Sequence, residues 1–60
     1  MKKYIIRDGY IGVFKYIDRL GFEIYQFPGG ESIADETEMQ NGFDTWQEAL
    51  QHIKDNEPKG

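Results

Sequence analysis

The first half of the chain has the apolar and polar pattern of β-strands. Three segments, 2–7, 10–17 and 22–27, are rich in β-branched and aromatic side chains. Asp8-Gly9 separates the first two segments and favours a tight hairpin turn. Pro28, followed by two glycines, ends the third segment. Three strands with short connections predict an antiparallel meander.

The segment 31–42 is compatible with three structures. A bare loop from Pro28 to Gly42 would be 15 residues long, which is at the upper end for a compact domain. Ser32 followed by Asp35 would allow one capped helical turn. The alternative that we favour is an acidic edge strand over residues 32–39, because its charges would block pairing with a further strand.

The last apolar pattern has the period of an amphipathic helix. Thr45 lies three residues before Glu48, and this spacing is that of a capping box. Asn56 is suited to close the helix, and Pro58 cannot continue it. The i, i+3, i+4, i+7 rule places one stripe of apolar residues on this helix, namely Trp46, Ala49, Leu50 and Ile53.

These elements predict an α+β fold. We expect a small antiparallel sheet of three or four strands, with one C-terminal helix packed on one face. The length of 60 residues fits one domain over residues 1–56, followed by a disordered tail at 57–60. A chain this short has a marginal core, and without cysteine it has no disulfide to reinforce that core.

The second predicted strand is apolar on both of its faces, yet one helix covers only one face of a sheet. Strict alternation gives an aliphatic set, Ile11, Val13 and Ile17, and an aromatic set, Tyr10, Phe14 and Tyr16. Because a tyrosine hydroxyl needs water or a partner, we assign the aliphatic set to the helix side. The aromatic set is then expected to point outward.

The outward aromatic set, together with Tyr25, is the first candidate binding surface. Large exposed apolar patches often mark protein contacts, and tyrosine is enriched in interfaces. A twofold homodimer through Tyr10, Phe14 and Tyr16 is one way to cover this surface. The alternative is that residues 31–42 and the twist of the strands partly bury these aromatic side chains.

Charge is distributed unevenly along the chain. Residues 1–30 carry five basic and three acidic side chains, whereas residues 31–60 carry two basic and eight acidic ones, which gives the net charge of −4. Nucleic-acid affinity depends largely on Lys and Arg, so this balance disfavours it. The acidic segment 31–48 instead suggests a partner with a basic surface, and Asp35, Glu36 and Glu38 are its candidate contacts.

The expected function is that of a small acidic protein–protein interaction module, which would bind through the aromatic sheet face, the acidic segment 31–48, or both. Such modules often act as inhibitors or adaptors, including ones made by phages or mobile elements. The alternative is binding of single-stranded nucleic acid, with bases stacked on the aromatic sheet face. A small-molecule enzyme with its site at a dimer cleft is the third hypothesis.

No catalytic residue, metal site or cofactor is predicted. His52, the one histidine, flanks the apolar stripe and has no nucleophile at a suggestive spacing. Asp35, Glu36 and Glu38 do not match a calcium-loop pattern, and no Lys-Ser or Lys-Thr follows Pro28-Gly29-Gly30 to make a phosphate loop. No segment approaches the roughly 20 apolar residues of a membrane helix, and we expect a cytoplasmic protein.

Overall fold

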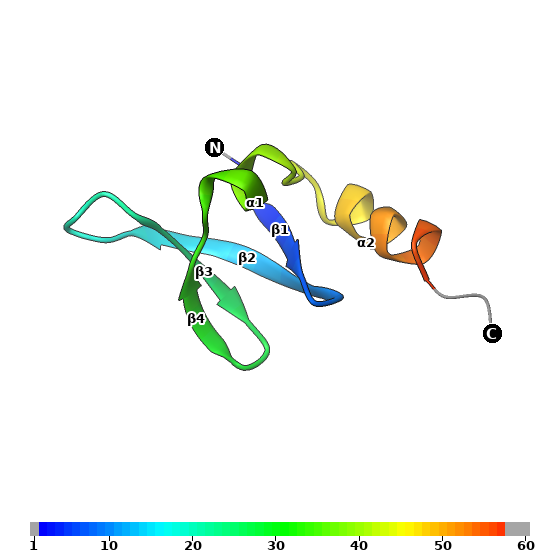
Figure 1. Ribbon diagram of the computed structural model, residues 1–60, viewed down its shortest axis with the longest axis horizontal. Coiled ribbons are helices and arrows are strands. Elements are labelled where there is room, and N and C mark those ends of the chain that lie inside the picture. The colour runs from blue at the N-terminus through cyan, green and yellow to red at the C-terminus, as the bar shows by residue number, and fades with distance from the viewer. Residues whose placement is uncertain (1, 58–60) are drawn as a thin grey trace.

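The computed structural model describes residues 2–57 and confirms the α+β fold (Figure 1). Four strands form one antiparallel sheet in the order β1-β2-β3-β4. Two helices follow the sheet in the sequence. The elements are β1 (Tyr4–Arg7), β2 (Tyr10–Ile17), β3 (Glu23–Phe27), β4 (Gly30–Ile33), α1 (Glu36–Gln40) and α2 (Trp46–Asp55).

The β1–β2 turn is the one that the sequence predicts. Asp8 and Gly9 both have positive φ angles, 53° and 81°. A two-residue hairpin turn of this type requires positive φ at both central positions, which Asp and Gly tolerate better than other residues. The turn sets the register in which Arg7 lies opposite Tyr10 and Ile5 lies opposite Gly12.

A β-bulge interrupts β2 and corrects the predicted alternation. Phe14 lies opposite Tyr25, but Tyr16 lies opposite Ile24, so Lys15 is an extra residue on β2. Directly opposite residues share a face of the sheet, and a one-residue shift moves each following side chain to the other face. Tyr16 therefore does not share a face with Phe14. The bulge has no clear signal in the alternation of the sequence.

The core lies on one face of the sheet, which we call the inner face. Its central residues are Ile5, Tyr25 and Ala34, with Phe14, Phe27 and Met39 packed against them. Met39 belongs to α1, so the segment after β4 covers this face. Tyr25 is fully buried and Phe14 and Phe27 are partly buried on this face, whereas Tyr10 at its end remains 60% exposed. The alternative that residues 31–42 partly cover the aromatic set therefore holds for Phe14 and not for Tyr10.

Gly12 provides the space for one aromatic ring of this core. A Cβ atom at Gly12 would overlap the ring of Phe27, which lies directly over the glycine. The guanidinium carbon of Arg7 lies 4.7 Å from the centre of the same ring. Phe27 is therefore held between the backbone of β2 and a side chain of β1.

The segment 31–42 is partly strand and partly helix. β4 is the edge strand but ends at Ile33, so the edge strand predicted over 32–39 is too long. The helical turn that follows is capped by Asp35 and not by Ser32: the Asp35 carboxylate accepts a hydrogen bond from the backbone N–H of Glu38. The Glu38 side chain accepts one from the backbone N–H of Asp35, which completes a capping box.

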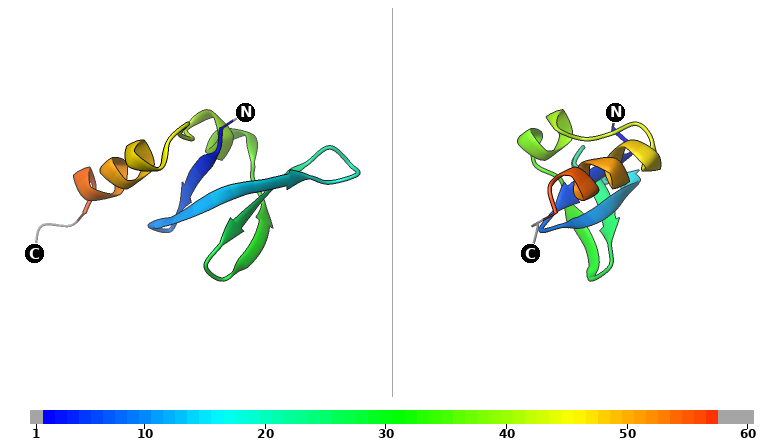
Figure 2. Two further views of the ribbon diagram at one scale, coloured as in Figure 1. Left: turned by 180° about the vertical axis from the view of Figure 1, so that it is seen from behind. Right: turned by 90° about the vertical axis from the view of Figure 1, so that its right-hand side faces the viewer.

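The predicted C-terminal helix is confirmed as α2. Thr45 caps its start through the backbone N–H of Glu48, and Asn56 is its C-cap. Its contact with the sheet runs along β1, where the rings of Tyr4 and Trp46 meet edge to face with centroids 5.9 Å apart. From there α2 extends away from the sheet (Figures 1 and 2), so it leaves the β2–β3–β4 part uncovered.

Candidate functional site

The predicted aromatic binding surface does not exist as one surface. Tyr25 is 0% exposed and donates a hydrogen bond from its hydroxyl to the backbone carbonyl of Lys2. Phe14 meets Tyr25 edge to face, with ring centroids 5.6 Å apart, and packs on the core. The expectation that both point outward is wrong, because the segment after β4 covers the inner face. An aromatic platform for stacked bases is therefore not formed by these residues.

Burial also makes the Tyr25 phenol a weaker acid than a free tyrosine. Its pKa is raised to about 12, chiefly because the ionised form would be poorly solvated and also because the carboxylate of Glu23 lies nearby. A phenol that stays neutral and donates to a backbone carbonyl is a structural group. We therefore assign Tyr25 to the core and not to a binding site.

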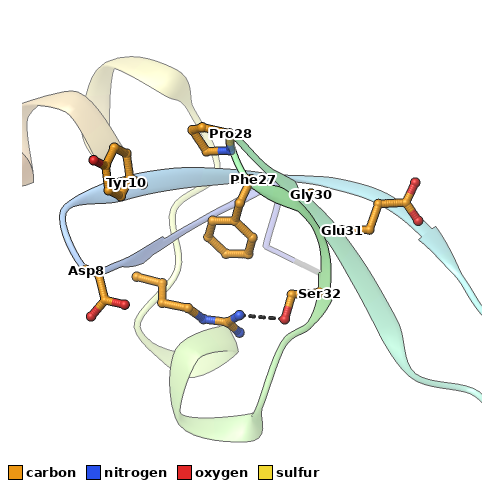
Figure 3. Close-up of a pocket in the computed structure, with 9 residues that line it drawn as sticks. Asp8, Tyr10, Phe27, Pro28, Gly30, Glu31 and Ser32 are labelled. Atoms are coloured by element: carbon orange, nitrogen blue, oxygen red, sulfur yellow. Dashed lines mark hydrogen bonds between the residues drawn. The ribbon is translucent and has the colours of Figure 1, made fainter.

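Tyr10 lies at the mouth of a cavity of about 600 Å³ between the β1–β2 and β3–β4 turns. Figure 3 shows Tyr10, Phe27 and Pro28 around this cavity, with the carboxylates of Asp8 and Glu31 on opposite sides of the view. The size is in the range of ligand pockets. The polar group at its base, however, is the guanidinium of Arg7, which is already bound within the chain.

Arg7 ties β1 to β4 and α1. Its Nε and one terminal nitrogen donate to the two carboxylate oxygens of Glu38 at 2.7 and 2.6 Å. Its terminal nitrogens also donate to the hydroxyl of Ser32 at 2.6 Å and to the carbonyl of Ile33 at 2.9 Å. The paired charges raise the pKa of Arg7 and lower that of Glu38, with the hydrogen bond between them as the main cause of each shift. This network closes the sheet over the core.

The predicted acidic contacts are therefore not equivalent. Glu38 is engaged with Arg7, and its side chain is only 16% exposed. The carboxylate of Asp35 is engaged in the α1 cap. Asp35 and Glu36 are both exposed. Within residues 2–57, Glu36 is the one of the three acidic residues that makes no ion pair and no side-chain hydrogen bond. The part of the acidic segment that is free for a basic partner is smaller than the sequence suggests.

The opposite face of the sheet carries several exposed apolar residues, and we call it the open face. Beside the half-buried pair Ile6–Ile11, cross-strand pairing places residues of this face in two longer rows, Tyr4–Val13–Gln26–Glu31 and Tyr16–Ile24–Ile33. Trp46 borders the first row through its contact with Tyr4. Val13, Tyr16, Ile33 and Trp46 are each between 40% and 49% exposed, and Ile24 is buried among the strands. Of the predicted site residues, only Tyr16 belongs to this face.

A polar network runs across the open face between the two rows. Lys15 contacts the carboxylate of Glu31 at 2.5 Å and the side-chain oxygen of Gln26 at 3.3 Å. The Tyr16 hydroxyl donates to the other oxygen of Glu31 at 3.0 Å. The hydrogen bond from Lys15 is the main cause that lowers the pKa of Glu31, and the hydrogen bond to Glu31 raises the pKa of both Lys15 and Tyr16. The charged side chains of this network neutralise each other.

A second exposed apolar group lies at the end of β2 and in the connection between β2 and β3. Leu20 is 74% exposed, and Ile17 and Phe22 are about half exposed. Asp18 organises this connection, because its carboxylate accepts hydrogen bonds from the backbone N–H groups of Leu20 and Phe22. The connection forms the end of the molecule opposite α2 (Figure 1).

The remaining candidates for chemistry are sparse. His52 is an exposed residue of α2, and the centroid of its ring lies 5.3 Å from the centroid of the Phe43 ring. Residues 2–57 contain no group of three or more His, Cys, Asp or Glu side chains that could hold a metal ion. In the same part of the chain, neither helix is long and apolar enough to span a membrane.

Comparisons with protein-family models, with curated proteins and with solved structures found no match. The surfaces of the described residues are therefore the basis on which a function can be proposed.

Proposed function

We propose that this chain is a small acidic protein–protein interaction module, and that its contact surface is the open face of the sheet. The observation that carries the proposal is the set of half-exposed apolar side chains there, formed by Val13, Tyr16, Ile33 and Trp46. The largest apolar patch on a typical monomer covers about 300–600 Å² and is often a contact site. Tyrosine and tryptophan are also the residue types that contribute most at protein interfaces.

The arrangement of this face suits a rigid docking surface. Its residues stand on paired strands, and the polar network of Lys15, Gln26 and Glu31 fixes the side chains between the apolar rows. A partner would meet apolar groups flanked by satisfied polar groups, which is the composition of a typical interface. Apart from Glu31, which is paired with Lys15, the exposed acidic residues Glu36 and Glu48 lie outside this face, on α1 and α2.

The proposal is tested by immobilising the wild-type chain and its variants, and by comparing the proteins that each captures from an extract of the source cells. Ile33→Lys places a charge in the open face, and Leu20→Lys makes the same substitution in the β2–β3 connection. We expect a captured protein to be lost with Ile33→Lys and retained with Leu20→Lys. A set of captured proteins that Ile33→Lys leaves unchanged would contradict the open face as the contact surface.

The acidic segment is tested in the same experiment through Glu36→Lys, which reverses the charge of an exposed residue on α1. Electrostatic attraction to a basic partner would be weakened by this change, most strongly at low ionic strength. Loss of capture with Glu36→Lys but not with Ile33→Lys would move the contact surface from the open face to α1.

A further inference from the structure

We propose that the occupant of the open face is a second copy of this chain, so that two sheets pack face to face as a twofold homodimer. The inference rests on the proposed function, and it replaces the pairing through Tyr10, Phe14 and Tyr16 that the sequence suggested. Two of those residues lie on the inner face, and Phe14 is packed against the core. Three features favour self-association through the open face: its charge, its area and the small core of the domain.

The first property is its charge. The ionised side chains within its two rows and the bulge are Lys15 and Glu31, and these two neutralise each other at 2.5 Å. Two copies that each carry a net charge of −4 repel one another, and this repulsion is weakest where the facing surfaces are locally neutral, as here. A strongly basic partner would gain little here, because Glu31 is already paired. The face therefore complements itself better than it complements a basic protein.

The second property is its area. The half-exposed side chains of Val13, Tyr16, Ile33 and Trp46 present on the order of 300 Å² of apolar surface, given that a large aromatic side chain can bury roughly 150–250 Å². A standard stable interface buries about 800 Å² per partner, polar rim included. The apolar area of the open face is enough for the centre of such an interface, and its polar network would form part of the rim. Little further area is left to be buried. We therefore expect a dimer that dissociates in the micromolar range.

The third reason concerns the whole domain, whose core is small. Ile5 and Tyr25 are the large side chains that residues 2–57 bury completely. Chains of this length often add a disulfide, a metal or assembly to such a core, and this chain has no cysteine. Sheets that pack face to face lie about 10 Å apart with interdigitated side chains, and this would cover both rows of the open face at once.

The test is sedimentation equilibrium of the full chain between about 1 and 500 μM, with thermal melts over the same range. We expect dimers at tens of micromolar and a melting temperature that rises with concentration, because assembly stabilises the folded state by mass action. Ile33→Lys should weaken association at least tenfold, and Leu20→Lys should leave it unchanged. Lysine is well tolerated on edge strands, so Ile33→Lys should still fold as a monomer.

Two results would overturn the inference. One is a wild-type chain that stays monomeric at 500 μM. The other is an equal loss of association in Leu20→Lys and Ile33→Lys, which would place the contact at the β2–β3 connection. A monomer whose capture of another protein is lost with Ile33→Lys would refute the homodimer but support the proposed function. A monomer whose captured proteins are unaffected by Ile33→Lys would refute both.

Discussion

Replacement of Glu38 by glutamine should weaken the fold at the point where β1, β4 and α1 meet. The carboxylate of Glu38 accepts two hydrogen bonds from Arg7 and one from the backbone N–H of Asp35. Glutamine has nearly the same shape and can keep part of the cap, but it has no charge and only one oxygen acceptor. The substitution therefore removes the charged, two-point contact with Arg7 and leaves the backbone of α1 otherwise unchanged.

The magnitude follows from the exposure of the two side chains. Fully exposed ion pairs contribute about 0–1 kcal/mol, whereas hydrogen bonds to charged groups contribute about 1.5–3 kcal/mol when water is excluded. The side chain of Arg7 is one third exposed and that of Glu38 is largely buried, so the pair lies between these limits. We expect Glu38→Gln to lower the free energy of unfolding by about 2 kcal/mol. A domain of this size has roughly 3–5 kcal/mol in total.

Urea denaturation followed by far-ultraviolet circular dichroism, at one fixed protein concentration, measures this change. Glu36→Gln is the matched control, because it makes the same substitution on the same helix at an exposed residue. The control should change stability by less than about 0.5 kcal/mol. Equal destabilisation by the two substitutions would refute the argument that Arg7 and Glu38 close the sheet.

The effect should also depend on pH in a defined direction. Contact with Arg7 lowers the pKa of Glu38 in the folded state below its ordinary value of 4.5. A lowered folded-state pKa means that the contribution to stability is complete above about pH 4.5 and is lost as the pH falls further. The difference in stability between wild type and Glu38→Gln should therefore be largest near pH 7 and shrink toward pH 3. A difference that grows in acid would contradict this assignment.

Three further substitutions test the core and the helix cap. Gly12→Ala should destabilise the fold by at least about 2 kcal/mol in urea melts, because its Cβ would overlap the ring of Phe27, whereas Gly29→Ala meets no atom and should be nearly neutral. Tyr25→Phe should remove the phenol that ionises last in an alkaline absorbance titration, since burial raises its pKa to about 12. Because the unfolded phenol ionises near pH 10, wild-type stability should be complete below about pH 10 and decline toward pH 12. Thr45→Ala should cost about 1 kcal/mol by removal of the cap of α2, measured as a lower urea midpoint.

The sequence by itself determines the elements whose causes are local. The Asp8-Gly9 turn, the end of β3 before Pro28 and the capped start of α2 all follow from residues close together in the chain. Turn and cap residues act through their own φ angles or through a hydrogen bond three residues away, so the pattern alone identifies them. The capping box of α1 is also local, and the spacing of Asp35 and Glu38 would have indicated it.

Only the tertiary structure decides which face of the sheet is covered. The bulge at Lys15 moves Tyr16 to the open face, and a strict alternation of apolar residues does not reveal it. Arg7 and Glu38 lie 31 positions apart in the sequence, yet their contact holds α1 over the inner face and leaves the other face open. Long-range contacts of this kind depend on the register of all four strands and on the curvature of the sheet. For that reason the exposed apolar residues of the candidate site could be located only once the chain was folded.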